Sequence, residues 1–184
     1  VEGGRAGVAL VYIGNMGTTY DLQTLVQAME LLPTATLDLA GAGAQAGTVV
    51  RLIQERGLAD RVRYHGYLKA ADMADLLSRA DIGVVPMASE SFVGVPYKFA
   101  DYAAAGLAIV SSLGGETEGL LARYGAGAVY RWGDAHSLAT AVDSLVPRLA
   151  SAQAAARRLA HEELNARRIY ADYVRAVGQL VATP

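Results

Sequence analysis

Residues 8–14 of the chain read VALVYIG, a run of six apolar residues that ends at a glycine. A continuous apolar run of this length is typical of a β-strand that is buried on both faces of a parallel sheet. After a short loop, apolar residues recur at helical spacing from Leu22 to Leu32 and stop at Pro33. This part of the chain therefore predicts one strand followed by one helix.

The same strand-then-helix unit recurs along most of the chain. Further short apolar runs occupy residues 37–40, 62–66, 82–85, 107–110 and 128–130, and a stretch with helical spacing follows each of them. Strands that alternate with helices predict a parallel sheet that is covered by helices on both faces. We therefore predict an α/β fold, a doubly wound, Rossmann-like parallel sheet of six strands.

The pattern changes at about Ser151. Residues 152–181 combine apolar residues at roughly helical intervals with interspersed arginines and glutamates. We predict a Rossmann-like domain over residues 1–150 and a C-terminal helical segment over residues 151–184. The ordinary interpretation of this segment is a helix, or a pair of helices, that lies across the sheet domain with its charged face in solvent.

Composition excludes several classes of protein. The chain has 184 residues, 53% of them hydrophobic, and a formal net charge of −2, which suits one domain with one core and disfavours nucleic acid as a partner. There is no Cys, and the three His are too far apart in sequence to form a local metal motif. No apolar run approaches the roughly 18 residues of a membrane span. We expect a cytoplasmic protein.

Glycine-rich loops follow two of the predicted strands, at residues 14–17 and 41–43. In an open parallel sheet, ligands bind beyond the carboxyl ends of the strands, where the strand order reverses. Glycines at those ends let backbone N–H groups approach a ligand closely, and the helix N-termini that follow favour anions. These loops therefore suit a ligand that carries phosphate, although neither a dinucleotide fingerprint nor a P-loop is present.

The most informative stretch is residues 86–110. It places one carboxylate, Glu90, on a loop, a lysine, Lys98, at the start of a helix, and a second carboxylate, Asp101, about one turn inside that helix. Carboxylates accept hydrogen bonds from vicinal hydroxyl groups, and a lysine near a helix N-terminus suits phosphate. Ribose, sugar and phosphate together describe a nucleotide-sugar.

With these residues in this order, the chain resembles the C-terminal, donor-binding domain of retaining glycosyltransferases of the two-domain GT-B architecture, in glycosyltransferase family 4. The resemblance covers about residues 8–147 and rests on the segments LAGAG (39–43), LADRVRYHGYL (58–68), ADIGVVP (80–86) and GGETE (114–118). It implies that residues 1–150 form half of a GT-B fold and bind a nucleotide-sugar donor. It also implies that an N-terminal acceptor-binding domain precedes Val1.

The acidic residues depart from the family pattern, in which two Glu are separated by seven residues. Glu90 matches the first acid, near the donor sugar and pyrophosphate, and Asp101 matches the second, on the ribose hydroxyls. Ten residues separate them here, three more than in the family. The alternatives are that Glu90 is a solvated loop acid and that Asp101 only interacts with the helix dipole.

A second departure is the loop after the first strand, where the family usually supplies an Arg and a Lys for the diphosphate. Residues 14–21 read GNMGTTYD and contain no cation. We hypothesise that Lys98 supplies the missing charge; the alternative is that its stem packs on the helix surface with its head in water. The resemblance thus implies catalytic roles for Glu90 and Lys98. It implies donor-binding roles for Gly14, Asn15, Gly41, Tyr67, Leu68, Met87, Gly94, Val95, Pro96 and Asp101.

The resemblance implies transfer of a sugar from a UDP-sugar, rather than a GDP-sugar, to a glycan or lipid-linked acceptor, with retention of configuration. No Asp-x-Asp motif is present, so we expect no essential metal and no cofactor. Peripheral association of the full-length protein with the inner face of the membrane is compatible with this role. We expect the isolated chain to bind nucleotide without transferring sugar. Two alternatives remain open: a UDP-sugar epimerase of the same architecture, and a non-catalytic nucleotide-sugar-binding module.

Overall fold

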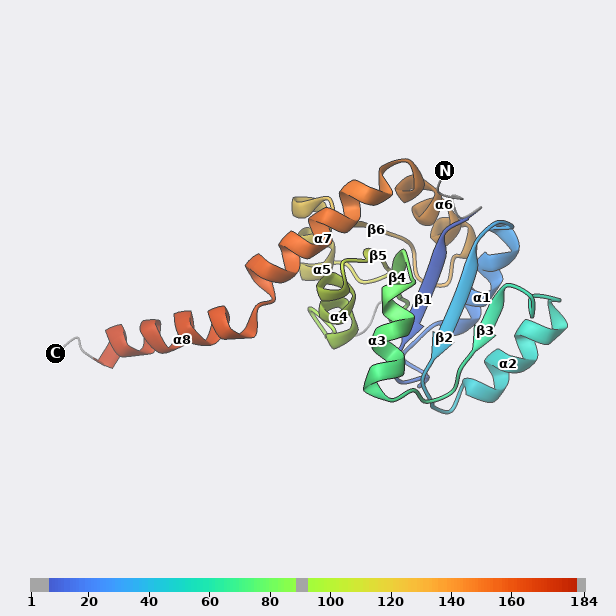
Figure 1. Ribbon diagram of the computed structural model, residues 1–184, viewed down its shortest axis with the longest axis horizontal. Coiled ribbons are helices and arrows are strands. Elements are labelled where there is room, and N and C mark those ends of the chain that lie inside the picture. The colour runs from blue at the N-terminus through green and yellow to red at the C-terminus, as the bar shows by residue number, and fades with distance from the viewer. Residues whose placement is uncertain (1–6, 89–92, 182–184) are drawn as a thin grey trace.

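The computed structural model of the chain describes residues 7–88 and 93–181 and contains a parallel sheet with the strand order β3-β2-β1-β4-β5-β6 (Figure 1). The strands are β1 (Ala9–Ile13), β2 (Thr36–Ala40), β3 (Val62–Tyr64), β4 (Ile82–Val85), β5 (Ala108–Ser111) and β6 (Gly127–Val129). Every neighbouring pair in the sheet is parallel. The predicted doubly wound α/β fold is confirmed.

Helices cover both faces of the sheet. One face packs against α1 (Leu22–Leu31), α2 (Ala46–Glu55) and α6 (Ala135–Leu145). The other packs against α3 (Ala70–Ser78), α4 (Tyr97–Ala105), α5 (Glu116–Tyr124) and α7 (Leu149–Glu163). A short 3-10 turn over Val146–Arg148 joins α6 to α7.

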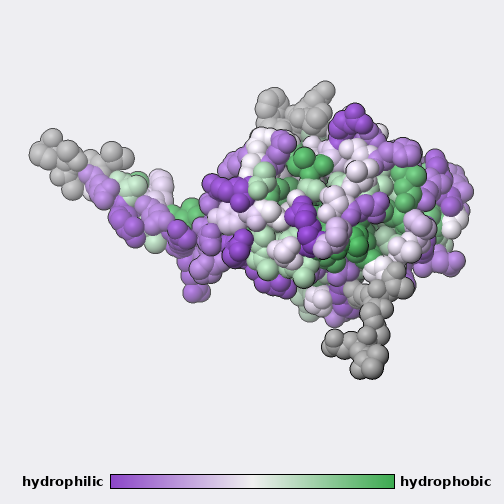
Figure 2. Space-filling view, turned by 90° about the horizontal axis from the view of Figure 1, so that it is seen from above, coloured by the Kyte–Doolittle hydropathy of each residue, from purple (hydrophilic) through white to green (hydrophobic). Residues whose placement is uncertain are grey.

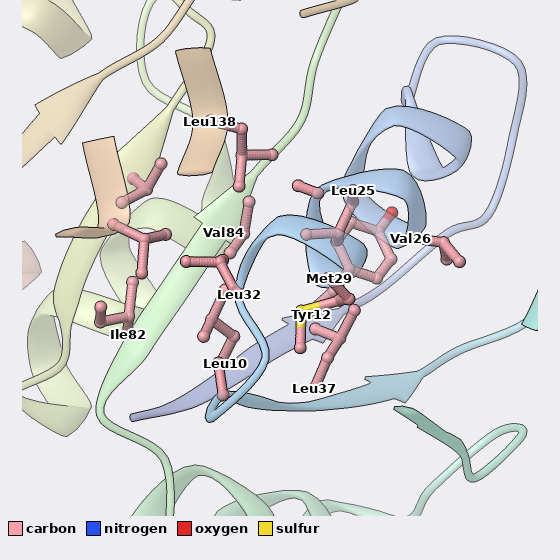
Figure 3. Close-up of a cluster of buried hydrophobic side chains, with 14 of the residues drawn as sticks. Leu10, Tyr12, Leu25, Val26, Met29, Leu32, Leu37, Ile82, Val84 and Leu138 are labelled. Atoms are coloured by element: carbon pink, nitrogen blue, oxygen red, sulfur yellow. The ribbon is translucent and has the colours of Figure 1, made fainter. Parts of the chain in front are cut away.

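The side chains of β1 alternate between these two faces, because successive residues of a strand point in opposite directions. Leu10 and Tyr12 belong to the cluster under α1, which Figure 3 shows, and Val11 and Ile13 belong to the cluster under α4. All five residues of β1 are buried. Burial of each large aliphatic side chain stabilises the fold by about 1.5–3 kcal/mol, so β1 anchors both layers.

The strand order reverses between β1 and β4, which pair with each other in the centre of the sheet. The chain leaves β1 toward α1 on one face, and it leaves β4 toward α4 on the other face. The loops after β1 and β4 therefore begin side by side and lead to helices on opposite faces of the sheet, which is the arrangement that forms a ligand crevice.

The C-terminal segment contains two helices with different surroundings. Helix α7 packs across the body against α4, and it buries four apolar residues, Ala152, Ala155, Ala156 and Leu159. Helix α8 (Ala166–Val181) instead projects away from the body as an arm (Figures 1 and 2). Asn165 causes the break, because its side chain accepts hydrogen bonds from the N–H groups of Arg167 and Arg168 and starts a new helix.

The prediction of a helix pair across the sheet domain is therefore correct for α7 and wrong for α8. The large apolar side chains of α8 up to Val177, among them Ile169 and Tyr173, are exposed. In the described part of the chain, no helix combines the length and the apolar character that crossing a membrane requires.

Candidate functional site at the strand-order reversal

Backbone hydrogen bonds join the loops after β1 and β4 at the reversal point. Tyr20 and Met87 form an antiparallel bridge. The Asp21 N–H donates to the Pro86 carbonyl at 2.7 Å, and the Ala88 N–H donates to the Thr19 carbonyl at 2.9 Å. The two loops therefore form one continuous surface, to which one loop contributes Tyr20 and the other Met87.

Glycines pack the loops after β1, β2 and β3 against one another. A Cβ on Gly41 would lie 1.8 Å from the carbonyl oxygen of Gly14, and Gly41 has a φ of +146°. The Gly41 N–H donates to the carbonyl of Gly66 at 2.7 Å, and the Gly14 N–H donates to that of Ala40 at 2.9 Å. Only glycine fits at position 41, because any side chain would push these backbones apart.

Two adjoining cavities open along this edge of the sheet. The smaller, of about 260 Å³, is mostly apolar and is lined by Gly14, Asn15, Ala40, Gly41, Ala42, Tyr67, Leu68 and Met73. The larger, of about 560 Å³, is lined by Ile13, Gly14, Asn15, Tyr20, Met73, Met87, Val93, Val95, Pro96, Tyr97, Lys98 and Asp101. Because they share Gly14, Asn15 and Met73, they form one continuous depression, which we call the switch-point groove.

The structure brings most of the predicted site residues together in this groove. Gly14, Asn15, Gly41, Tyr67 and Leu68 line its smaller cavity. Met87, Val95, Pro96, Lys98 and Asp101 line its larger cavity. Glu90 lies outside the described residues.

Gly94 does not line either cavity of the groove. It packs against the start of α5, where the buried Thr117 hydroxyl donates to its carbonyl at 2.5 Å. A Cβ on Gly94 would lie 2.7 Å from a carboxylate oxygen of Glu116. Gly94 therefore holds the loop after β4 against α5 and does not face the groove.

Lys98 is the second residue of α4 and is only 7% exposed. Its Nζ lies 3.5 Å from the centroid of the Tyr20 ring and 4.3 Å from that of the Tyr12 ring. It also donates a hydrogen bond of 3.1 Å to the Tyr12 hydroxyl. The interpretation of Lys98 as a surface lysine with its head in water is therefore wrong, because the ammonium lies in an aromatic cage.

This cage has no negative charge of its own in the described part of the chain, where no carboxylate forms an ion pair with Lys98. Burial lowers the pKa of Lys98 to about 7. Burial also raises the pKa of the Tyr12 hydroxyl, which therefore stays protonated and donates to the Asn15 carbonyl. The cage thus holds a lysine whose pKa is close to neutral pH, and this lysine lines the groove.

Asp101 lies one helical turn beyond Lys98 on α4, and both line the larger cavity. Its side chain is accessible, and within the described residues it has neither a hydrogen-bond donor nor an ion-pair partner. Partial burial raises the pKa of its carboxyl group. Asp101 therefore presents an acceptor to the groove that no described protein group occupies.

Four residues that build the site are not among those predicted from the sequence: Tyr12, Tyr20, Gln45 and Thr117. The Gln45 side-chain amide donates to the Tyr20 carbonyl at 2.8 Å and also to the Gly17 carbonyl, so it holds the loop after β1. In the sequence, Tyr12 is one residue of the apolar run over residues 8–13. The signal that was available is its hydroxyl, since a tyrosine in a fully buried strand needs a hydrogen-bond partner.

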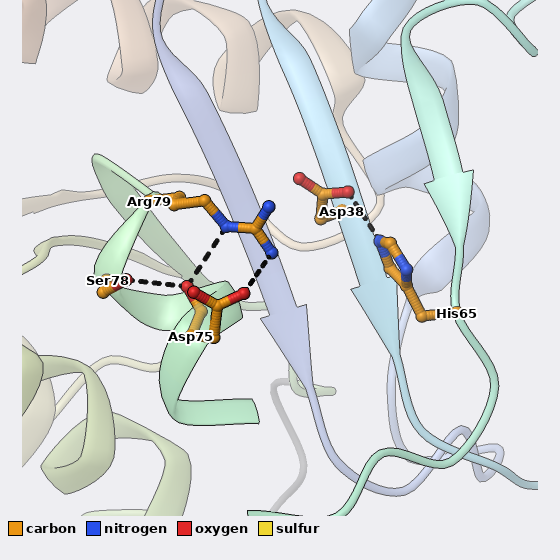
Figure 4. A network of polar contacts seen from close by, with 5 residues as sticks. All are labelled: Asp38, His65, Asp75, Ser78 and Arg79. Carbon is orange, nitrogen blue, oxygen red and sulfur yellow. Dashed lines mark hydrogen bonds and ion pairs between the residues drawn. The ribbon is translucent and has the colours of Figure 1, made fainter. Parts of the chain in front are cut away.

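A second polar network lies on the open part of the sheet near β3 (Figure 4). His65 Nε2 lies 2.6 Å from Asp38 Oδ1, and Arg79, directly after the last residue of α3, forms an ion pair with Asp75 of that helix. Neither pair includes a residue of the switch-point groove. Among residues 7–88 and 93–181, no group of three or more His, Asp or Glu residues could hold a metal ion.

A doubly wound parallel sheet with a glycine-lined groove at its reversal point defines the class of α/β domains that bind their ligands beyond the carboxyl ends of the strands. The protein family described as Glycosyl transferases group 1 matches residues 7–147, and the chain belongs to this family.

The chain is also similar to individual proteins of known sequence or structure. Glycogen synthase of Mycobacterium tuberculosis is 31% identical over 160 residues, which are 83% of this chain and 37% of that protein. The structure of sucrose-phosphate synthase from Thermosynechococcus elongatus has a TM-score of 0.82 at 23% identity, covering 98% of this chain and 47% of that one. The structure of Anabaena HepE with UDP and glucose has a TM-score of 0.80 at 15% identity, covering 95% and 49%. The chain spans less than half the length of each of these relatives.

Proposed function

We propose that this chain is the donor-binding half of a retaining glycosyltransferase of GT-B architecture. The complete protein would transfer a sugar from a nucleotide-diphosphate sugar, UDP-linked rather than GDP-linked, to a glycan or a lipid-linked acceptor. Membership of the glycosyltransferase family supports the reaction class. The observation that carries the donor role is the placement of Lys98 and Asp101 in one groove at the reversal point.

The two cavities suit different parts of the donor. The smaller one is apolar and has Tyr67, Leu68 and Met73 in its lining, so it suits the flat base. Lys98 and Asp101 lie one helical turn apart, about 5–6 Å between neighbouring side-chain positions, which suits a diphosphate beside the lysine and ribose hydroxyls on the carboxylate. The UDP bound in the related Anabaena structure supports this choice of ligand.

The proposed reaction breaks the bond between the anomeric carbon and the diphosphate oxygen. A bond to the acceptor oxygen forms on the same face, and the acceptor proton passes to the leaving diphosphate. Negative charge develops on that diphosphate, so a cation at Lys98 stabilises the transition state. Glu90 keeps its proposed role near the donor sugar, and the mechanism requires no metal ion.

The test is binding of nucleoside diphosphates, measured as the rise in melting temperature, because a ligand that binds only the folded state stabilises it. UDP is expected to raise the melting temperature more than GDP does. Lys98→Met and Asp101→Asn are expected to reduce the rise, whereas Lys69→Met and Asp143→Asn preserve it. These controls change exposed residues that line neither cavity. A chain that neither UDP nor GDP stabilises would contradict the donor role.

A second measurement separates transfer from epimerisation. The isolated chain is expected to bind UDP-sugars without transferring sugar, because the acceptor site is proposed to lie in another domain of the full-length protein. That full-length protein, incubated with UDP-sugars and no acceptor, is expected to yield no epimer. Formation of an epimer would favour the epimerase alternative.

A further inference from the structure

The Lys98 side chain is held by interactions that supply no counter-charge. Its Nζ faces the rings of Tyr12 and Tyr20, and the hydroxyl of Tyr12 accepts its hydrogen bond. Two features oppose a positive charge there. The side chain is buried, and it belongs to the first turn of α4, where the helix dipole is positive. In the described part of the chain, two aromatic rings and one hydroxyl are thus the groups that favour its protonated form, and none of them carries a negative charge.

The amine is nevertheless open to the groove at one point. A Cβ placed on Gly14 would lie 3.5 Å from both Cε and Nζ of Lys98. Gly14 has no side chain, so a ligand that lies against its backbone meets the amine directly. Gly14 also lines both cavities, so this opening lies where the two cavities of the groove meet.

We infer that binding of a nucleoside diphosphate is coupled to the uptake of one proton from solvent by Lys98. This inference rests on the proposed function. In the free site the amine is largely neutral at pH values above neutrality, since burial lowers its pKa to about 7. A diphosphate at Gly14 supplies the missing counter-charge, favours the ammonium form and so raises the pKa again.

Other titratable groups also lie around Lys98, and we assign the proton uptake to the lysine and not to them. Tyr12 comes from β1, Tyr20 from the loop after it, and Tyr97 and Asp101 from α4 itself. Burial keeps the Tyr12 hydroxyl protonated, because it raises its pKa. Met73 of α3 and Met87 after β4 also line the larger cavity, and their side chains do not titrate.

Calorimetric titration with UDP at pH 8.5, in two buffers of different ionisation enthalpy, measures the protons taken up. At this pH the terminal phosphate of UDP is already ionised, since its pKa is about 6. The wild-type chain is expected to take up close to one proton, and its affinity to fall about tenfold per pH unit between pH 7.5 and 9.

Two variants identify the group that takes up the proton. Lys98→Arg is expected to bind UDP without proton uptake and with an affinity that does not change with pH, because the guanidinium stays charged. Asp101→Asn is expected to bind more weakly but to retain the uptake. The ¹³Cε shift of Lys98, recorded at pH 8.5 with and without UDP, reports the same protonation in the unaltered chain.

The outcomes separate the two proposals. Binding of UDP to the wild-type chain at pH 8.5 with no proton uptake and an unchanged ¹³Cε shift would overturn the coupling while the donor role stands. Proton uptake that persists in Lys98→Arg would also overturn it. Absence of UDP and GDP binding at pH 6.5, where Lys98 is charged, would overturn the donor role itself.

Discussion

The hydroxyl of Tyr102 accepts a hydrogen bond of 2.9 Å from the backbone N–H of Ile13, the last residue of β1. Tyr102 belongs to α4 and is fully buried. Its ring lies against β4, where a Cβ on Gly83 would approach it to 2.3 Å. One side chain therefore fixes α4 against both strands of the reversal point, and α4 carries Lys98 and Asp101.

Tyr102→Phe is expected to lower the free energy of unfolding by about 1–3 kcal/mol, because it leaves the buried N–H of Ile13 without an acceptor. Urea denaturation measures the change. Tyr97→Phe is the matched control on the same helix, since the Tyr97 side chain is 93% exposed, and it is expected to have no effect. An equal loss in both variants would contradict the importance of the Ile13 hydrogen bond.

Gly83→Ala is expected to lower the free energy of unfolding by more than about 2 kcal/mol, because the methyl group overlaps the Tyr102 ring and the packed core cannot yield. The matched control is Gly47→Ala in α2, where a Cβ meets no atom within 4 Å. That change is expected to stabilise by about 0.5–1 kcal/mol, since Gly is a poor helix former. Both values follow from thermal or urea denaturation. A stable Gly83→Ala chain would disprove the tight contact.

The sequence predicted the sheet well because buried parallel strands are continuous apolar runs. Each predicted strand differs from the observed one by at most two residues at either end. Most of the predicted site residues also meet in the groove, because the carboxyl ends of parallel strands lie at one edge of the sheet.

The cage around Lys98 could not be predicted in the same way. Tyr12 and Lys98 are 86 positions apart in sequence, and no local period relates a strand residue to the first turn of a distant helix. The direction of α8 could not be predicted from the sequence either. The apolar positions of a helix indicate that one of its faces suits burial, but they do not say which surface, if any, covers it.

Deletion of residues 166–184 is expected to leave the melting temperature of the body unchanged within about 2 °C. The side chains of α8 up to Gln179 are exposed and absent from both core clusters, so their removal takes no described packing from the fold. Leu159→Ala in α7 is the contrasting change, expected to cost about 2–5 kcal/mol because this side chain is fully buried. A large loss of stability on deletion would mean that α8 packs against the body in solution.

Lys98→Met is expected to stabilise the ligand-free chain, and by an amount that depends on pH. Below pH 7 the lysine is protonated in both the folded and the unfolded chain, and the folded chain bears the full cost of a buried ammonium. Methionine has a similar length and no charge, so the free energy of unfolding of the Lys98→Met variant should exceed that of the wild type at pH 6.

Between pH 7 and the ordinary lysine pKa of 10.5, the unfolded chain keeps its proton while the folded chain loses it. The unfolded state then binds more protons, so the stability of the wild type rises with pH relative to the variant, by about 1.4 kcal/mol per pH unit. The advantage of Lys98→Met should therefore shrink by about 2 kcal/mol from pH 7 to pH 8.5. Urea denaturation of both chains at pH 6, 7 and 8.5 isolates this difference, because all other titrating groups are shared. A difference that stays constant with pH would show that Lys98 keeps its ordinary pKa, and a variant that is less stable at pH 6 would show that the aromatic cage outweighs the cost of burial.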